Sequence, residues 1–431
     1  MTRQSRTALR KVDSHDLSGV QRRRPRLLFL SQTLPFPPDG GVHIRAFNLL
    51  RLLAARFDVT ALCFFRRSAR ATREEVEQVA EALRSHAGLA SVEAFPIPQE
   101  YSRIRLLWDH ARSAATGKVY TFFTHESTEY RRSLECLLRE TVFELIHVDS
   151  LDLSFYLRML PSLPVICDHH NVESALLERR SRQESTSLRR MYVAHQARLM
   201  LREERRWCPK VSLNLTVSQE DESALQQRAC GAAVLVVPNG VDTGDFEPAY
   251  GGDDGIVFVG GYTWFPNRDG MEYFAKQILP MIREKDPTAE IRWVGRAPED
   301  VILSYRNDFG IEMTGYVRDI RPHVTPAACF IVPLRVGGGT RLKILDAWAM
   351  GKAIVSTSQG CEGLDCVDGE NILIRDSPKA FSDAVIQVLS DPELRVRLGR
   401  AGRETAEAKY DWERIGVQML AAYDALLPSS H

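Results

Sequence analysis

A glycine-rich turn followed by two cations is the stretch of this sequence best suited to bind an anion. Residues 330–334 form a short apolar run that predicts a buried strand, and residues 337–339 are three glycines that let the backbone approach a ligand closely. A helix predicted at residues 341–350 directs its first amides to the same point, where Arg341 and Lys343 add positive charge. For the turn alone, an ordinary strand-to-helix connection with solvated basic residues is the alternative.

The residues around this turn resemble a known donor-binding segment. The run GTRLKILDAWAMGKAIVST, followed by GCEGL, and the earlier PNGVD resemble the retaining glycosyltransferases of family 4, which are built on the two-domain GT-B fold. That family usually carries two glutamates separated by seven residues, whereas this chain has Gly338 and Asp346 at those positions, and its GTRLK form resembles one branch of the family. The resemblance covers nearly the whole chain from residue 26 onwards.

The resemblance implies transfer of a sugar from a nucleotide diphosphate sugar with retention of the anomeric configuration, without a metal or another cofactor. Such a reaction needs preorganised amides and cations at the leaving diphosphate, which gains negative charge as the glycosidic bond breaks. Arg341 and Lys343 are the catalytic candidates for that charge, and Gly338, Gly339 and Thr340 are expected around the phosphates.

Further donor contacts are expected from both halves of the chain. Asp346 suits the ribose hydroxyls, because a carboxylate can accept two hydrogen bonds from a diol. In FVGGYTWFPNRDG, Gly261 follows Gly260 where the family has an arginine, and Arg268 is the nearest substitute for the family's lysine. The remaining candidates are Arg318, in a turn that resembles the one beside the base, and Gly40 and Gly41, in a loop that resembles the one near the donor phosphates.

Histidines at predicted strand ends are candidates for the acceptor side. His147 in IHVDS, and His169 and His170 in DHHNVES, follow buried-strand runs and have acids beside them. The family often has a histidine near the acceptor in this half, and all three stay candidates. His125 and Glu126 in FFTHES are a further option.

Alternating strand and helix patterns predict the scaffold that positions these residues. Strands are expected at residues 26–31, 58–64, 90–96, 143–148, 164–168, 213–217 and 234–237, and then at 255–259, 290–295, 311–314, 329–333 and 353–356. Helical patterns between them, such as that of residues 43–55, give a βα alternation in each set. The prediction is an α/β protein of the GT-B type, with two Rossmann-like domains facing each other across a central cleft.

A division of the chain into four segments follows from this alternation. Residues 1–25 are expected to be a disordered basic tail, 26–240 the acceptor-side domain, and 241–410 the domain that binds the nucleotide sugar. The PNGVD motif and the acidic, glycine-rich stretch after it predict the linker between the domains. Residues 411–431 contain a predicted helix that, in the family, returns to the first domain.

Composition predicts a soluble cytoplasmic protein without a nucleic-acid partner. The 431 residues include 56 Lys and Arg against 56 Asp and Glu, so the global positive field expected of a nucleic-acid binder is absent. The eight cysteines form no CxxC pair and no zinc-ligand spacing with histidines, which favours reduced thiols and no metal site. No apolar run approaches the ~20 residues needed to span a bilayer.

Local basic segments nevertheless predict peripheral contact with a membrane. The first 26 residues are rich in arginine, and so is a second run at residues 172–207. A solvated helical pair explains the second run without any function, while the alternative is a basic face towards an acidic membrane or a lipid-phosphate acceptor. Under that alternative the protein would work at the inner face of a membrane.

The leading functional hypothesis is a glycosyltransferase that builds a polysaccharide or exopolysaccharide on a glycan or lipid-linked acceptor. A GT-B sugar-nucleotide epimerase is a second hypothesis, because it shares the cleft but uses water in place of a sugar acceptor. A catalytically silent nucleotide-sugar-binding protein is a third, because Gly338 stands where the family has its first glutamate. A nicotinamide dehydrogenase is disfavoured, since no GxGxxG follows the first predicted strand.

Overall fold

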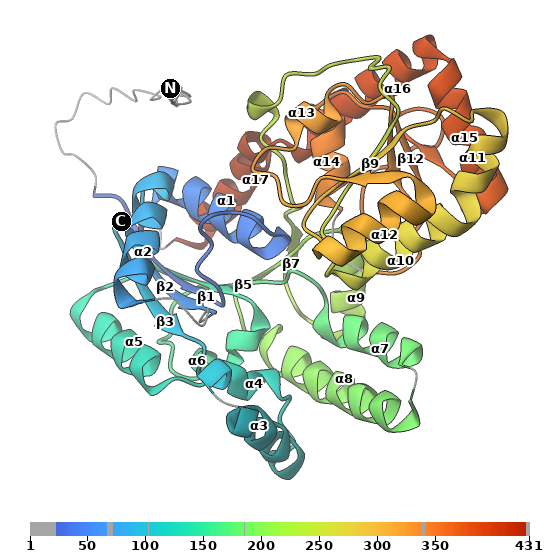
Figure 1. Cartoon of the computed structure of the whole chain (residues 1–431). Helices are drawn as coiled ribbons and strands as arrows, with labels where there is room; N and C mark the ends of the chain where they lie inside the picture. The colour runs from blue at the N-terminus through green and yellow to red at the C-terminus, as the bar shows by residue number, and fades with distance from the viewer. Residues whose placement is uncertain (1–22, 67–71, 102, 185, 338–340, 428–431) are drawn as a thin grey trace, which may run out of the picture.

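The computed structural model describes residues 23–66, 72–101, 103–184, 186–337 and 341–427, which form two α/β domains (Figure 1). Within these ranges, a seven-stranded parallel sheet has the order β3-β2-β1-β4-β5-β6-β7. A six-stranded parallel sheet in the second half has the order β10-β9-β8-β11-β12-β13. The predicted pair of Rossmann-like domains is confirmed.

The strands of both sheets lie where apolar runs predicted them. The first sheet consists of β1 (Arg26–Ser31), β2 (Asp58–Phe65), β3 (Ser91–Pro96), β4 (Leu145–Asp149), β5 (Val165–Asp168), β6 (Leu213–Thr216) and β7 (Val234–Val236). The second consists of β8 (Ile256–Val259), β9 (Ile291–Val294), β10 (Ile311–Met313), β11 (Cys329–Val332), β12 (Ile354–Ser356) and β13 (Leu373–Ile374). Only β13 was not predicted, because two residues are too short to form a recognisable run.

Helices cover both faces of each sheet. The first domain has α1 (Gly41–Arg56), α2 (Arg73–Ala87), α3 (Arg103–Thr116), α4 (Thr121–Thr124), α5 (Thr128–Glu140), α6 (Ser154–Leu157), α7 (Glu173–Gln183), α8 (Ser187–Trp207) and α9 (Gln219–Arg228). The second has α10 (Phe265–Tyr273), α11 (Leu279–Lys285), α12 (Glu299–Phe309), α13 (Arg321–Val324), α14 (Leu342–Ala349), α15 (Pro378–Ser390) and α16 (Pro392–Thr405), and α17 (Trp412–Leu426) follows. None of the described helices combines the length and the apolar character needed to cross a bilayer.

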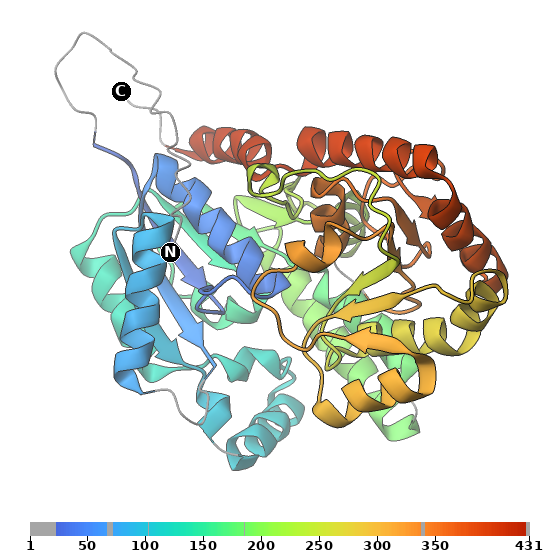
Figure 2. The same cartoon turned by 45° about the horizontal axis from the view of Figure 1, so that its top comes forward.

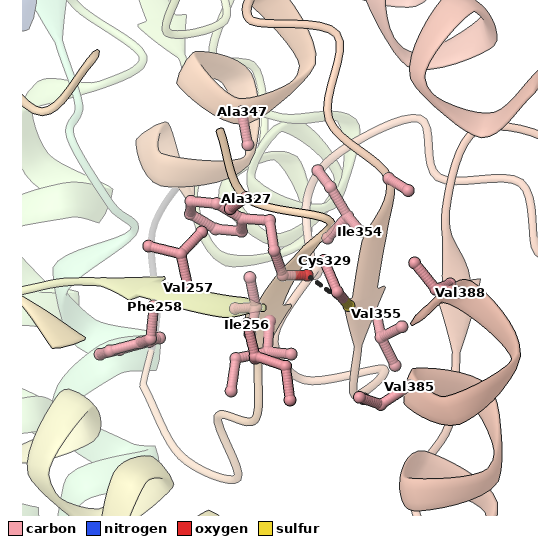
Figure 3. Packing of buried hydrophobic residues seen from close by; sticks show 14 of the residues in the cluster. Ile256, Val257, Phe258, Ala327, Cys329, Ala347, Ile354, Val355, Val385 and Val388 are labelled. Atoms are coloured by element: carbon pink, nitrogen blue, oxygen red, sulfur yellow. Dashed lines mark hydrogen bonds between the residues drawn. The ribbon is translucent and has the colours of Figure 1, made fainter. Parts of the chain in front are cut away.

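The core of the second domain shows why its strands read as continuous apolar runs. Figure 3 shows Ile256, Val257 and Phe258 of β8 near Cys329 of β11 and Ile354 and Val355 of β12, with Ala347 of α14 and Val385 and Val388 of α15 around them. Because helices cover both faces of a parallel sheet, side chains that point to either face are buried. The strands therefore show no alternation of apolar and polar residues.

The C-terminal helix α17 packs against the first domain (Figures 1 and 2). Its residues Trp412, Met419 and Tyr423 belong to the same buried cluster as side chains of β1 and α1. A Cβ added at Gly416 would lie 2.6 Å from the Cδ2 atom of Leu52 on α1, so the two helices approach closely at this glycine. The chain thus runs from the first domain to the second and back.

Candidate functional site

The glycine-rich turn lies at the carboxyl edge of the second sheet, between β11 and α14. Gly337 has a φ of +123°, a conformation that favours glycine. Arg341 is buried at the start of α14, where its guanidinium donates a hydrogen bond to the backbone oxygen of Gln359 at 3.1 Å. Burial lowers the pKa of Arg341 from its usual value. The candidates Gly338, Gly339 and Thr340 lie outside the described residues.

Lys343, in the first turn of α14, faces an aromatic ring. Its ammonium lies 4.2 Å from the ring centroid of Phe258 on β8 and donates a hydrogen bond to Oδ1 of Asn267 on α10, at 2.7 Å. Burial lowers the pKa of Lys343 well below its usual range, and the neighbouring charge of Arg341 acts in the same direction. No carboxylate forms an ion pair with Lys343 in the part of the chain that the structure describes. A bound anion would therefore stabilise its charged form.

Asn267 connects Lys343 to the turn after β8, and sequence reasoning missed it. The side-chain amide of Asn267 donates to the backbone oxygen of Gly261 at 3.0 Å, while its oxygen accepts from Lys343. A Cβ at Gly260 would lie 2.5 Å from the same amide nitrogen, so only glycine fits there without movement. The one signal in the sequence is a polar residue on the buried face of a predicted helix.

Asp346 lies three residues after Lys343 on α14. Burial raises the pKa of its carboxyl to about 7. No ion pair or hydrogen bond of this side chain occurs within the described ranges, so its oxygens have capacity for a ligand. The binding of ribose hydroxyls by Asp346 stays a prediction.

The two other arginine candidates of the second domain are exposed. Arg268 lies on α10, with its guanidinium 5.7 Å from the ring centroids of both Tyr262 and Phe265. Arg318 lies in the loop after β10. In the same region, the guanidinium of Arg296 lies 4.9 Å from the ring centroid of Tyr316, a pair that sequence reasoning did not single out.

The loop with Gly40 and Gly41 brings the first domain to this site. Helix α1 begins at Gly41, and a Cβ added there would lie 3.7 Å from the Cδ1 atom of Leu342, the first residue of α14. The amino termini of α1 and α14 therefore meet at the interface between the domains. Both helices contribute free amides and the positive end of their dipole, and neither has an acidic residue in its first turn.

Among the candidate histidines, His170 lies at the carboxyl edge of the first sheet with its side chain partly accessible. Its Nε2 atom lies 2.8 Å from Oδ1 of Asp149, and the other carboxylate oxygen, Oδ2, accepts a hydrogen bond from the hydroxyl of Ser31 at 2.8 Å. Burial alone would lower the pKa of His170, but the charge and hydrogen bond of Asp149 outweigh burial and raise it. His170 is thus a cation-prone group at this edge.

His147 and His169 are buried inside the first domain. The ring of His147 stacks on Phe29 at 4.2 Å between centroids, and its Nδ1 is hydrogen-bonded to the hydroxyl of Tyr423 at 2.6 Å. His169 is hydrogen-bonded to Asn214 at 3.0 Å. Burial lowers the pKa of both, to about 4 for His147, so both rings are neutral at neutral pH. A side chain at the end of a strand can point into the domain or towards solvent, and the sequence alone did not distinguish these two cases.

The further option was His125 with Glu126, and the Nδ1 atom of His125 is buried without a hydrogen-bond partner among the described residues. His125 is buried against the ring of Phe64, and burial lowers its pKa to about 4. Glu126 accepts a hydrogen bond from Arg112 at 2.6 Å.

A buried group of His147, Asp149 and Asp168 has the composition of a metal site, with one potential ligand atom from each within 4.8 Å of the others. Its carboxylates already have partners, however. Asp168 accepts two hydrogen bonds from Arg45, at 2.6 and 2.7 Å, and Asp149 is bound by Ser31 and His170. The two negative charges are therefore compensated by the protein, and we assign this group a structural role.

Polar groups near His170 retain hydrogen-bonding capacity. Oδ1 of Asp152 and Oγ1 of Thr121 are buried and form no well-aligned hydrogen bond among the described residues, although the Thr121 hydroxyl interacts with the carboxyl of Asp152. Burial raises the pKa of Glu173 to about 8, and the charge of Asp152 contributes to this shift. Asp152 and Thr121 were missed from the sequence, because their neighbourhood arises from segments far apart along the chain.

The fold has the GT-B architecture, with two parallel-sheet domains. The amino termini of α1 and α14 meet between the domains, and the first domain carries the pair of His170 and Asp149. A family model described as "Glycosyltransferase Family 4" matches residues 39–245, and one described as "Glycosyl transferases group 1" matches residues 253–391. Each half of the chain thus matches a glycosyltransferase family model, and the chain has the GT-B fold.

Relatives and solved structures agree with this assignment. A phosphatidyl-myo-inositol mannosyltransferase of Mycolicibacterium smegmatis is 26% identical over 213 residues, which are 47% of this chain and 54% of that protein. A lipopolysaccharide core biosynthesis glycosyltransferase of Rhizobium meliloti is 31% identical over 122 residues, 26% of this chain and 34% of that protein. The first of these matches thus spans about half of the relative's length.

The solved structures show a shared fold over almost the whole chain. Sucrose-phosphate synthase from Thermosynechococcus elongatus has a TM-score of 0.65 and 17% identity, covering 93% of this chain and 99% of that one. The Anabaena protein HepE, in complex with UDP and glucose, has a TM-score of 0.62 and 14% identity at the same coverage.

Proposed function

We propose that this protein transfers a sugar from a nucleotide diphosphate sugar to a glycan or lipid-linked acceptor, with retention of the anomeric configuration, in polysaccharide or exopolysaccharide biosynthesis. The observation that carries the proposal is the approach of Gly41 to Leu342. It brings two helix amino termini, Arg341 and Lys343 to one place between the domains. We assign the chain to the branch of the family with the GTRLK motif.

In this proposal the diphosphate binds at the meeting point of α1 and α14. The bond between the anomeric carbon and the phosphate oxygen breaks while a bond to the acceptor oxygen forms on the same face of the sugar. The hydroxyl proton of the acceptor passes to the departing phosphate oxygen. Negative charge grows on the leaving diphosphate, and Arg341, Lys343 and the helix amides offset it. Lys343 suits this role because its charge is weakly compensated before the anion arrives.

The nucleoside would extend along the second sheet. Asp346 accepts hydrogen bonds from the ribose hydroxyls in this scheme. Arg318 and the exposed pair of Arg296 and Tyr316 would contact the base. One relative is named as a GDP-mannose-dependent mannosyltransferase, and one structural neighbour contains UDP-glucose. Guanosine and uridine diphosphate sugars are therefore the first donors to test.

For the acceptor we propose the side of His170. This histidine carries a raised pKa beside Asp149, and the buried Oδ1 atom of Asp152 next to it is a candidate acceptor for a hydroxyl group. His147 and His169 then position the strands on which this edge depends. Nucleotide sugars are cytoplasmic metabolites, so the proposal places the enzyme on the cytoplasmic side.

Thermal unfolding with UDP-, GDP- and ADP-sugars tests the donor site, because a bound donor raises the midpoint temperature by mass action. The preferred donor is then incubated with glycan and lipid-linked acceptors, and NMR determines the anomeric configuration of the product. Isomerisation of the sugar with donor alone would indicate the epimerase, and binding without turnover across the acceptors would indicate a silent binding protein. An inverted product would overturn the retaining assignment.

A further inference from the structure

Two helices of the first domain display large apolar side chains to solvent. On α3, Ile104 is 78% exposed, Leu107 69% and Trp108 60%. On α8, Leu188 is 81% exposed and Met191 70%. Single exposed apolar residues are common, but a group of this size usually marks an interaction site.

These side chains lie on two helices, α3 and α8, that contact each other through side-chain hydrogen bonds. His110 on α3 is hydrogen-bonded to Tyr192 on α8, and Gln196 donates to Ser113 at 3.0 Å. The two hydrogen bonds join neighbouring turns of α3 and α8. We call the five exposed side chains and their basic neighbours Arg103, Arg189 and Arg190 the α3–α8 surface.

Every exposed charged side chain of α8 is an arginine. Its two acids are Glu203 and Glu204, and both are buried, with Glu203 paired to Lys118 at 2.6 Å and Glu204 hydrogen-bonded to Ser174. Its six arginines are all exposed: Arg189, Arg190, Arg198, Arg202, Arg205 and Arg206. The solvent face of the helix therefore carries positive charge without compensating acids.

We infer that the α3–α8 surface docks on an anionic lipid bilayer, with the apolar side chains in the interfacial region and the arginines against the head groups. A second copy of this chain is disfavoured as the occupant, because a two-fold contact would place arginines against arginines. A nucleic acid is disfavoured too, since exposed Ile, Leu and Met side chains gain nothing from phosphates or solvated base edges.

The surface adjoins the acceptor side of the domain. The ring of His110 stacks on that of Tyr120 at 4.7 Å between centroids, and Thr121, whose hydroxyl interacts with Asp152, follows directly. An acceptor held in the bilayer would thus lie next to His170 and Asp152. The inference rests on the proposed function for its role, but binding to a membrane can be measured without any glycosyl transfer.

Sedimentation with vesicles of phosphatidylcholine, with and without phosphatidylglycerol, tests the inference on the full chain. We expect binding to the anionic vesicles that is weakened, but not abolished, by high salt, because the apolar contacts are insensitive to screening. The variant Ile104→Ser/Leu107→Ser/Leu188→Ser should reduce binding roughly tenfold or more. Arg189→Gln/Arg190→Gln should weaken binding and make the remainder less dependent on salt.

Matched controls separate this surface from general effects. Leu303→Ser removes an exposed leucine from α12, and Arg131→Gln/Arg132→Gln removes two exposed arginines from α5, and both variants should bind vesicles like the wild type. The thermal shift with donor should be unchanged in all variants, which keeps this test apart from the proposed function. Failure of the wild type to bind anionic vesicles would overturn the inference. So would undiminished binding by the apolar variant, or self-association that this variant abolishes.

Discussion

At the start of α14 a lysine ammonium lies against an aromatic ring and an amide oxygen, without a carboxylate partner in the described chain. Burial of a poorly compensated cation costs folding free energy, and an arriving diphosphate would recover part of that cost. The same residue should therefore reduce the stability of the unliganded protein and contribute strongly to the reaction. Arg341 differs, because it also donates to the backbone of Gln359 and so supports the turn itself.

We expect Lys343→Met to lower kcat/KM by a factor equivalent to about 2–4 kcal/mol while leaving the melting temperature unchanged or higher. Methionine keeps the packing on Phe258 but removes the charge. Steady-state kinetics and thermal unfolding measure the two effects. Lys276→Met is the matched control, since Lys276 is exposed and pairs with Glu272 at 2.5 Å. Wild-type turnover in Lys343→Met would remove this lysine from the mechanism.

Because of Asp346, we expect the free energy of unfolding to decrease as the pH rises. Its pKa is about 7 in the folded protein against 3.8 for an ordinary aspartate, so between these values the folded state binds more protons than the unfolded state. The free energy of unfolding should thus decrease from about pH 4 to pH 7. In Asp346→Asn this contribution disappears, and we expect the variant to be more stable than the wild type at pH 8 by on the order of 1–2 kcal/mol.

Urea unfolding at pH 5 and pH 8 measures this difference, and the donor-induced thermal shift should be smaller in Asp346→Asn at both pH values. Asp383→Asn serves as the control, because Asp383 is exposed and lies beside Lys285 and Lys379. Equal destabilisation of Asp346→Asn at both pH values would show that the carboxyl is not buried in its charged form.

At the scale of elements, the turn after β8 depends on a glycine that has no room for a side chain. A Cβ at Gly260 would lie 2.5 Å from the amide nitrogen of Asn267, whereas at Gly261 the nearest atom, the backbone oxygen of Arg296, is 3.9 Å away. We expect Gly260→Ala to displace Asn267, to remove the acceptor of Lys343 and to cost about 1–3 kcal/mol of stability. Gly261→Ala should keep the wild-type melting temperature. Equal melting temperatures for the two variants would contradict this account of the turn.

The elements themselves were largely predictable, and their side-chain contacts were not. Strands such as β1 and β11 are local apolar runs, so a few consecutive residues are enough to predict their positions. The contact between Asn267 and Lys343 joins residues 76 positions apart, and the bond between His147 and Tyr423 joins residues 276 apart. Periodicity carries no information about such pairs. The roles expected of Arg268, Arg318 and the three histidines therefore remain predictions that only variants can test.

At the scale of the whole molecule, the proposed diphosphate site draws its positive charge from both domains. The amide-rich start of α1 belongs to the first domain, while Arg341 and Lys343 belong to the second. Because protein cations and amides offset the charge of the leaving group in this arrangement, we expect turnover to continue in the presence of EDTA. Loss of activity with EDTA and its recovery with magnesium or manganese would contradict this proposal.

The C-terminal helix ties the last residues of the described chain to the first sheet through one buried hydrogen bond. The hydroxyl of Tyr423 is bonded to Nδ1 of His147, and Nε2 of His147 has no partner among the described residues. In Tyr423→Phe the Nδ1 atom of His147 loses its hydrogen bond and the buried ring is left with no partner, so we expect a loss of about 1–3 kcal/mol in the free energy of unfolding. His147→Phe should cost a similar amount, because it leaves the buried hydroxyl of Tyr423 unpaired.

The double variant His147→Phe/Tyr423→Phe replaces both partners by apolar rings of similar shape, and it should recover most of the loss. Urea unfolding of the four proteins gives the coupling energy, and Tyr250→Phe, at a partly exposed tyrosine, is the control.

Since burial holds the pKa of His147 at about 4, the folded state binds fewer protons than the unfolded state below pH 6.5. The wild type should therefore lose stability as pH falls from 6.5 to 4, and the variants that lack His147 should lose less. Additive losses in the double variant would show that α17 is not anchored to the first sheet through this bond.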